Sequence, residues 1–148
     1  MYFERVDNVG HEKGPGAPET LAAIREVDAA VGRVVQALDA HGLRATTDVV
    51  VVSDHGMAPV RPDQYIALED MATIEQAEAV STGQVIGFNP RSGHEASTER
   101  RLLGRHDHYT CWRKQDLPAR WHYGTHPRVP AIVCQFDEGW NGLPADQL

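Results

Sequence analysis

The stretch Asp48-Val-Val-Val-Val-Ser-Asp-His-Gly-Met57 decides the fold. Its four consecutive valines, with no polar alternation, are typical of a strand that is buried on both faces, as in a parallel sheet. We therefore predict a strand at residues 48–53. Asp54 and His55 follow at its carboxyl end, where ligands bind in open α/β sheets. The stretch predicts an α/β fold and also a place for chemistry.

A long helix is predicted just before this strand, at residues 18–41. Its apolar residues recur at steps of three and four and form one stripe: Leu21, Ile24, Val27, Val31, Val34, Val35 and Leu38. Pro18 suits a first helical turn, and Gly42 suits the residue just past the end. A Gly/Pro-rich loop is expected at residues 12–18. The helix, its connection and the buried strand form half of an α/β unit.

The second half of the chain has shorter predicted elements. We expect a strand or helical turn at 65–71, a helix at 95–103, and strands at 84–88, 109–113 and 131–136. This pattern is typical of an α+β extension. The chain, residues 1–148, is therefore divided into a helix–strand unit, residues 1–60, and the extension, residues 61–148.

Composition and charge restrict the function classes. The length of 148 residues fits one domain, and the 41% apolar content suffices for a packed core. The net charge of −7 disfavours a nucleic-acid-binding surface and adhesion to an anionic membrane. No segment approaches the roughly 20 apolar residues of a membrane-spanning helix, and the first residues, MYFERVDNVG, do not resemble a signal peptide.

The two cysteines, Cys111 and Cys134, are too few for a disulfide scaffold, and their spacing is not that of a zinc ribbon. They either pair across one loop or remain free, and we favour two free, buried thiols. A pairing would instead point to an oxidising compartment.

Two short clusters contain residue types that bind metals. The first is Asp7 and His11, with Gly10 permitting a tight turn between them. The second is Asp54 and His55, at the end of the predicted strand. Carboxylate oxygen and imidazole nitrogen both suit zinc. Because the helix and strand run in opposite directions, both clusters are expected at one edge, where two metals about 3.5–4 Å apart could clamp a phosphoryl group.

Alternatives stay open on the residues alone, because spacing is weak evidence for a metal site. Asp7 and His11 could form a surface turn in which the carboxylate accepts a local backbone hydrogen bond. The remaining histidines favour other roles: His41 at the helix end, His106 and His108 solvated on a strand edge, His122 and His126 packed among aromatic residues, and His94 in a loop.

Residues 2–59 closely resemble the nucleotide pyrophosphatase/phosphodiesterase family of the alkaline phosphatase superfamily. The likeness is carried by YFERVDNVGHEKGP and, after the helix, VVVVSDHGM. The later segment CWRKQDLPARWHYGTHPRVPAIVCQFDEGW also looks like bacterial members of the family. The two motifs at this separation are specific, whereas either alone would be weaker. The resemblance implies part of an alkaline-phosphatase-like sandwich, with a central, mostly parallel sheet flanked by helices, plus a small α+β extension.

The resemblance also implies an activity. Enzymes of this family hydrolyse phosphodiesters and nucleotide pyrophosphate bonds with two zinc ions and a threonine nucleophile. By resemblance, Asp7 and His11 match ligands of the zinc that holds the attacking water. Asp54 and His55 match ligands of the zinc that activates the nucleophile. Tyr2 matches an aromatic residue that stacks on the nucleobase, and bacterial members are commonly exported.

Parts of the family's pattern are unmatched in this sequence. The segment that supplies the threonine and another aspartate ligand has no counterpart, nor does the Gly-x-His-Gly segment. His126 lies in a different family segment, so we do not assign it as a ligand. We therefore expect a fragment of the catalytic domain that lacks the nucleophile, has incomplete ligand sets and is inactive alone. The valine run, residues 49–52, would then offer an unpaired sheet edge for self-association.

Two other interpretations remain. The chain could belong to another hydrolase of the superfamily, one that acts on phosphomonoesters or sulfate esters, although Tyr2 favours a diesterase. It could also be a non-catalytic, metal-binding fragment or degenerate copy that reuses the scaffold.

Overall fold

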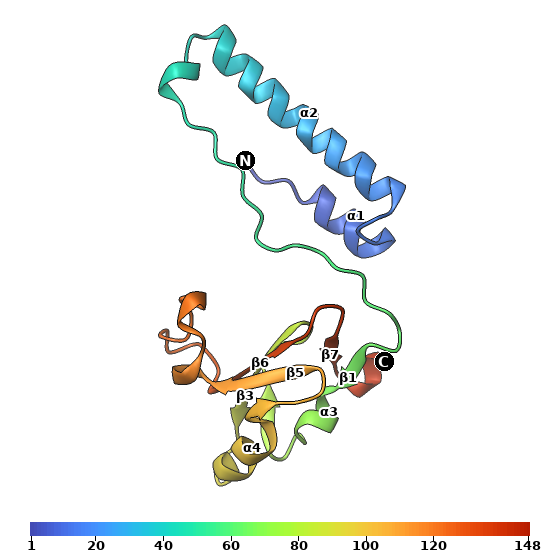
Figure 1. The fold of residues 1–148 in the computed structure, drawn as a ribbon, viewed down its shortest axis with the longest axis vertical. Helices are drawn as coiled ribbons and strands as arrows, with labels where there is room; N and C mark the ends of the chain where they lie inside the picture. The colour runs from blue at the N-terminus through green and yellow to red at the C-terminus, as the bar shows by residue number, and fades with distance from the viewer. The chain divides into compact units, whose positions relative to one another are not determined.

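The computed structural model describes all 148 residues. The chain forms two compact units, Met1–Pro59 and Val60–Leu148 (Figure 1). The first unit contains two α-helices, α1 (Arg5–Lys13) and α2 (Pro18–Ala40), and a short 3-10 helix, η1 (Arg44–Thr46). The helix predicted at residues 18–41 is therefore confirmed, and His41 directly follows its last residue. None of the helices combines the length and apolar character that a membrane span requires.

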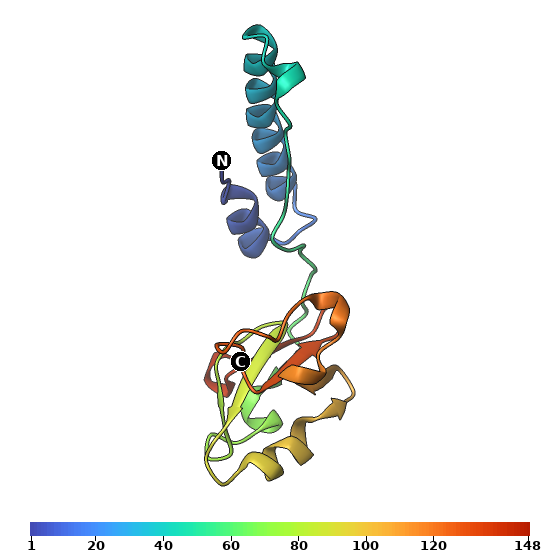
Figure 2. The ribbon, with the colours of Figure 1, turned by 90° about the vertical axis from the view of Figure 1, so that its left-hand side faces the viewer.

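The two helices of the first unit pack through small side chains. Figure 2 shows α1 beside the first turns of α2. Thr20 and Ala23 are the buried residues of α2 at this contact. The Thr20 hydroxyl donates a hydrogen bond of 2.8 Å to the carbonyl oxygen of Gly14, in the turn between the helices. This bond fixes the angle at which α2 leaves α1.

The strand predicted at residues 48–53 is wrong for this structure. Residues 47–59 form neither helix nor strand, and the valine side chains are exposed, from 40% at Val49 to 84% at Val52. A buried strand needs neighbours that accept and donate its backbone hydrogen bonds. No strand of the described chain pairs with this segment, so its backbone groups face solvent.

The second unit is built on a five-stranded sheet of order β2-β3-β6-β5-β4. These strands are β2 (Ala77–Ala79), β3 (Val85–Pro90), β4 (Gly104–Arg105), β5 (Tyr109–Arg113) and β6 (Ile132–Phe136). Every neighbouring pair is antiparallel. The five-stranded sheet is therefore antiparallel, whereas a mostly parallel sheet was expected. Only the separate pair β1 (Tyr65–Ala67) and β7 (Asn141–Leu143) is parallel. The strands predicted at 84–88, 109–113 and 131–136 are confirmed as β3, β5 and β6.

Helices complete the second unit. These are α3 (Leu68–Met71), α4 (Glu95–Leu102), and the 3-10 helices η2 (Lys114–Asp116), η3 (Ala119–Trp121) and η4 (Ala145–Gln147). The stretch 65–71 contains both of the predicted alternatives, because strand β1 leads directly into helix α3. The guanidinium of Arg113 on β5 donates two hydrogen bonds, of 2.8 and 2.7 Å, to Glu99 on α4. This pair holds the pKa of Glu99 below its usual value and fixes α4 against the sheet.

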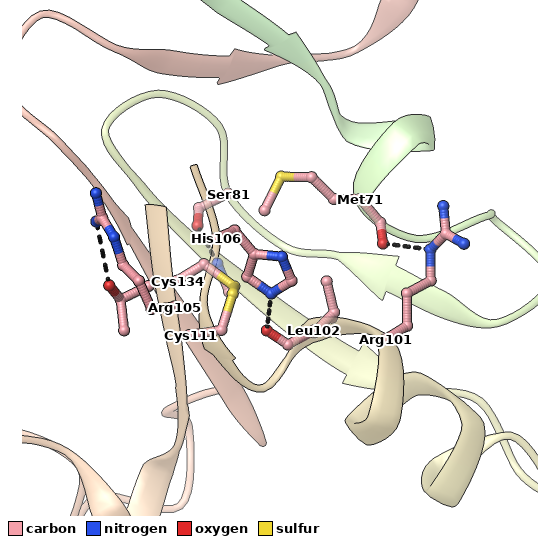
Figure 3. Close-up of a disulfide and its surroundings, with 10 residues drawn as sticks. Met71, Ser81, Arg101, Leu102, Arg105, His106, Cys111 and Cys134 are labelled. Carbon is pink, nitrogen blue, oxygen red and sulfur yellow. Dashed lines mark hydrogen bonds between the residues drawn. A yellow bond between two sulfur atoms is a disulfide. The ribbon is translucent and has the colours of Figure 1, made fainter. Parts of the chain in front are cut away.

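The core of the second unit surrounds a disulfide between Cys111 and Cys134. The core side chains are Leu68, Met71, Ala72, Ala77, Ile86, Phe88, Leu102, Cys111, Ile132, Cys134 and Phe136. The cysteines lie directly opposite each other on β5 and β6, with Cα atoms 4.0 Å apart. The expectation of free thiols is thus wrong, although both residues are buried as expected. Figure 3 shows His106 beside the disulfide, with its Nε2 hydrogen-bonded to the Leu102 carbonyl at 2.8 Å.

We expect Gly124→Ala to destabilise the second unit by about 1–3 kcal/mol. Gly124 has a φ of +112°, and a Cβ there would lie 2.5 Å from the carbonyl oxygen of Lys114. The matched control is Gly93→Ala, because Gly93 also has a positive φ, +84°, but open space around the added carbon. Urea denaturation of both variants should show the larger loss for Gly124→Ala. Equal losses would mean that the contact with Lys114 is unimportant.

Candidate metal centre

Helix α1 places Asp7 and His11 on one face, because residues four apart on a helix are neighbours. Nε2 of His11 lies 3.4 Å from Oδ1 of Asp7. The helix continues to Lys13, so the loop predicted at residues 12–18 begins later than expected. The tight turn expected at Gly10 is also wrong, since Gly10 lies within the helix and is its one buried residue.

The segment after the valine run brings the second cluster to the first. Nε2 of His55 lies 3.4 Å from the same Oδ1 of Asp7 and 3.9 Å from Oδ1 of Asp54. The rings of His11 and His55 have centroids 6.4 Å apart. All four residues belong to the first unit. One carboxylate oxygen of Asp7 therefore links the two clusters.

This carboxylate oxygen has an unusual environment. Oδ1 of Asp7 is buried and accepts no hydrogen bond, although the Asp7 side chain as a whole remains 42% exposed. Leaving a buried acceptor without a donor costs free energy, about 1–3 kcal/mol for a neutral group and more for a charged one. A bound cation would satisfy such an atom.

His55 is held in one tautomer by its own backbone. Its Nδ1 lies 2.8 Å from the carbonyl oxygen of Gly56. Because a carbonyl only accepts, Nδ1 carries the hydrogen, and neutral His55 presents the lone pair of Nε2 toward Asp7. Metal-binding histidines commonly have this arrangement, with the second nitrogen donating to a carbonyl.

Nearby acceptors and charges raise the pKa of His55. The largest cause is the hydrogen bond to the Gly56 carbonyl, followed by the negative charge of Asp54 and, after a smaller opposing effect of burial, that of Asp7. Each stabilises the protonated ring. His55 can therefore bind a cation best at a pH above its own pKa, where Nε2 carries no proton.

We expect Asp54→Asn to lower the pKa of His55 in the metal-free chain. The substitution removes the negative charge that favours the imidazolium and keeps the side-chain volume. An NMR titration of the His55 ring measures the change directly. Asp39→Asn is the control, because Asp39 lies at the far end of α2 and is absent from the causes of the shift. An unchanged His55 pKa in Asp54→Asn would contradict the assigned cause.

The donor atoms fit zinc in type, and those of Asp7 and His11 also fit it in spacing. Zinc bonds of about 2.0–2.2 Å in a tetrahedral arrangement put neighbouring ligand atoms about 3.4 Å apart. Nε2 of His11 lies 3.4 Å from Oδ1 of Asp7, whereas Nε2 of His55 lies 3.9 Å from Oδ1 of Asp54. However, no group of three or more histidine, cysteine, aspartate or glutamate side chains is arranged here to hold a metal ion. The residues thus fit part of a zinc site, with further ligands required.

Three other predicted residues, Tyr2, His106 and His108, have different surroundings. Tyr2 precedes α1 and is 82% exposed. His106 and His108, expected to be solvated, are instead half-buried: the first stacks on Tyr109 and the second on Trp140, with ring centroids 4.4 and 3.5 Å apart. These stacks support packing roles for both rings.

Sequence reasoning missed two residues of the site. Gly10 was read as a turn residue, and Met57 was not assigned a role. A Cβ at Gly10 would lie 2.5 Å from the sulfur of Met57, so the two residues are in contact. No local pattern gave a signal for this contact, because Gly10 and Met57 are far apart in the sequence. Helix α1 was not predicted, because Asp, Asn and Gly in the stretch Asp-Asn-Val-Gly also favour turns.

Comparisons with known proteins cover nearly the whole chain. The sequence model for type I phosphodiesterase / nucleotide pyrophosphatase matches residues 1–145. Human ectonucleotide pyrophosphatase/phosphodiesterase family member 5 is 29% identical over 143 residues, which are 97% of this chain and 30% of that protein. Bis(5'-adenosyl)-triphosphatase enpp4 of Xenopus laevis is 31% identical over 141 residues, 95% of this chain and 31% of that protein. The chain thus spans about a third of these relatives.

Solved structures give the same result. Murine ectonucleotide pyrophosphatase/phosphodiesterase 5 aligns with a TM-score of 0.83 and 31% identity, covering 97% of this chain and 39% of that one. An inactive variant of the murine protein in complex with AMP aligns with the same TM-score and identity, over 97% of this chain and 38% of that one. The α/β fold class predicted from the sequence is confirmed by these matches.

Proposed function

The chain belongs to the type I phosphodiesterase / nucleotide pyrophosphatase family, and from this premise we propose that it is part of a zinc-dependent phosphodiesterase catalytic domain. Asp7 and His11 bind the zinc that holds the attacking water, and Asp54 and His55 bind the zinc that activates the nucleophile. The observation that supports this most strongly is the buried Oδ1 of Asp7, which accepts no hydrogen bond and lies 3.4 Å from Nε2 of both histidines.

The chemistry follows from these side chains. Bound zinc lowers the pKa of water or a hydroxyl and neutralises charge at the phosphorus centre. The Asp7 carboxylate supplies negative charge for the cations. Because it lies between the rings of His11 and His55, it links the two zinc positions. The Gly56 carbonyl fixes the His55 ring, so that Nε2 faces the site without reorganisation. No residue of this chain is assigned as the threonine nucleophile.

The proposed substrate is a nucleotide with a phosphodiester or pyrophosphate bond. One relative is named a bis(5'-adenosyl)-triphosphatase, and one solved neighbour was captured with AMP. Tyr2 is free to stack on the nucleobase, because its ring is 82% exposed. Broad nucleic-acid binding remains disfavoured by the net charge of −7.

Zinc titration of the chelator-treated, 148-residue chain tests the proposal. Calorimetry should detect zinc binding that weakens as the pH falls through the raised pKa of His55, because the imidazolium cannot bind a cation. An absence of zinc binding above that pKa would overturn the proposed site. With zinc added, the chain alone should not hydrolyse a bis-aryl phosphodiester, and robust turnover would place a nucleophile within it.

We also propose that the valine run mediates self-association of the isolated chain. Its four exposed side chains and unpaired backbone form a template for pairing with a second copy. Sedimentation velocity should show concentration-dependent oligomers that the double variant Val50→Lys, Val52→Lys abolishes. Ile74→Lys is the control, because Ile74 is 67% exposed and lies outside the run. Oligomers that persist in the double variant, or a monomeric parent chain, would contradict the role of the run.

A further inference from the structure

Gly10 forms a notch in the surface of α1 that the side chain of Met57 fills. A Cβ at Gly10 would lie 2.5 Å from the sulfur of Met57 and 2.9 Å from its methyl carbon. Any side chain at this position would therefore displace the thioether. Gly10 is the one buried residue of α1, which shows how fully the contact covers it.

The contact joins residues that are close in sequence to the candidate ligands of both clusters. Gly10 directly precedes His11 and is three residues after Asp7, while Met57 is two residues after His55. One apolar contact thus fixes the distance between the helix that carries one cluster and the segment that carries the other.

Residues 47–59 have little else to hold them in place. Their backbone makes no hydrogen bond with the helices, and the side-chain hydrogen bonds of Ser53 and His55 remain within the segment. The approach of His55 to Asp7 is the one ionic contact between the segment and α1. Besides that contact, which involves the ligands themselves, the packing of Met57 against Gly10 holds the segment at the site.

Thr20 forms a wall of the notch. Its methyl carbon would lie 3.9 Å from a Cβ at Gly10. The same side chain is 4% exposed, and its hydroxyl bonds to the Gly14 carbonyl in the turn between the helices. Because Thr20 belongs to α2 and also lines the notch on α1, the shape of the notch depends on where α2 lies.

We propose that Gly10, Met57 and Thr20 are positioning residues that set the spacing between His55 and the pair Asp7 and His11. Met57 fills the notch at Gly10, and this contact holds the extended segment, and with it Asp54 and His55, beside Asp7 and His11. This role rests on the proposed zinc site, and it adds that zinc affinity depends on a contact that includes no ligand atom.

Gly10→Ala tests the role, with Gly32→Ala as its matched control. Both add one methyl group to a helix and both raise helix propensity by about 1 kcal/mol. Gly32 has open space around it, whereas Gly10 is covered by the flexible end of Met57, which can move aside without unfolding the chain. Calorimetry should show about tenfold weaker zinc binding for Gly10→Ala, a loss typical of residues that orient ligands. Gly32→Ala should bind as the parent chain does.

A double-substitution cycle separates positioning from general destabilisation. Met57→Ala removes the side chain that fills the notch and should also weaken zinc binding. The combination of Met57→Ala with Gly10→Ala should be no weaker than the worse single variant, because both act through one contact. Additive losses, or a Gly10→Ala variant that binds zinc as tightly as Gly32→Ala, would overturn the proposal.

NMR of the metal-free chain keeps this test independent of the zinc site. Gly10→Ala should shift the Met57 methyl resonance and the His55 ring resonances, while Gly32→Ala should shift neither. If the parent chain binds no zinc but these shifts occur, the positioning contact stands and the proposed metal site fails. If the shifts are absent, the positioning contact is wrong whatever the chain binds.

Discussion

Asp7→Asn should lower the affinity of the chain for zinc by at least about 100-fold, while the metal-free chain keeps its helices. Asparagine keeps the volume of the side chain and removes the charge. Residues that merely orient ligands already cost about 10–100-fold when lost, and Asp7 is proposed to bind directly. The metal-free chain should keep its helices, because the side-chain volume is unchanged and Oδ1 of Asp7 accepts no hydrogen bond within α1.

Two measurements on the same sample examine this expectation. Calorimetric zinc titration gives the affinity, and circular dichroism gives the helix content and its thermal transition. Asp28→Asn is the control, since Asp28 is an exposed carboxylate on α2 and the variant has the same net charge. An Asp7→Asn variant that binds zinc like the control would remove Asp7 from the ligand set. A variant that loses its helices would show that Asp7 has a structural role instead.

Replacing both Cys111 and Cys134 with alanine should destabilise the second unit by about 3 kcal/mol. The disulfide closes a loop with a sequence separation of 23 residues, and the unfolded chain gains conformational entropy when that closure is lost. Both sulfur atoms also lie in the core, where truncation leaves unfilled space. The sheet itself remains paired through β3, β5 and β6, so the variant should fold with a lower denaturation midpoint.

The tryptophans allow this loss to be measured on the second unit alone. Trp112, Trp121 and Trp140 all lie within Val60–Leu148, so their fluorescence reports its unfolding in urea. Reductant during denaturation should lower the midpoint of the parent chain toward that of the double variant, and it should leave the double variant unchanged. A parent chain with the same midpoint in both conditions would show that the disulfide contributes little stability.

Local patterns in the sequence predict much of the fold. Helix α2 was predictable because its apolar stripe repeats at helical spacing over many turns, and β5 was predictable from its apolar and aromatic run. Helix α1 was missed, since Asp-Asn-Val-Gly carries turn-forming residues and few apolar ones. For the valine run the error is the opposite one, because a strand was predicted and none forms. The run has a strong strand preference, but a strand also needs neighbouring strands to pair with, and these must come from other parts of the chain.

The candidate site likewise has a part that the sequence predicts and a part that it does not. The residue types Asp7, His11, Asp54 and His55 were recognisable from their motifs, and the structure brings all four into the first unit. The roles of Gly10 and Met57 depend on a contact between residues far apart in the sequence, and no local pattern reveals it. The pairing of Cys111 with Cys134 likewise depends on the register of β5 against β6.

The parallel pair β1 and β7 brings the first and last residues of the second unit close together. Tyr65 and Asn141 are neighbours in this pair, and Val60 and Leu148 line the same shallow groove as Tyr65 and Leu143. Residues 60 and 148 of the unit therefore lie close together on its surface. A module whose ends meet can be inserted into a loop of a host protein with little distortion of the host. Transplanting residues 60–148 into an exposed loop of an unrelated carrier should therefore leave both partners folded.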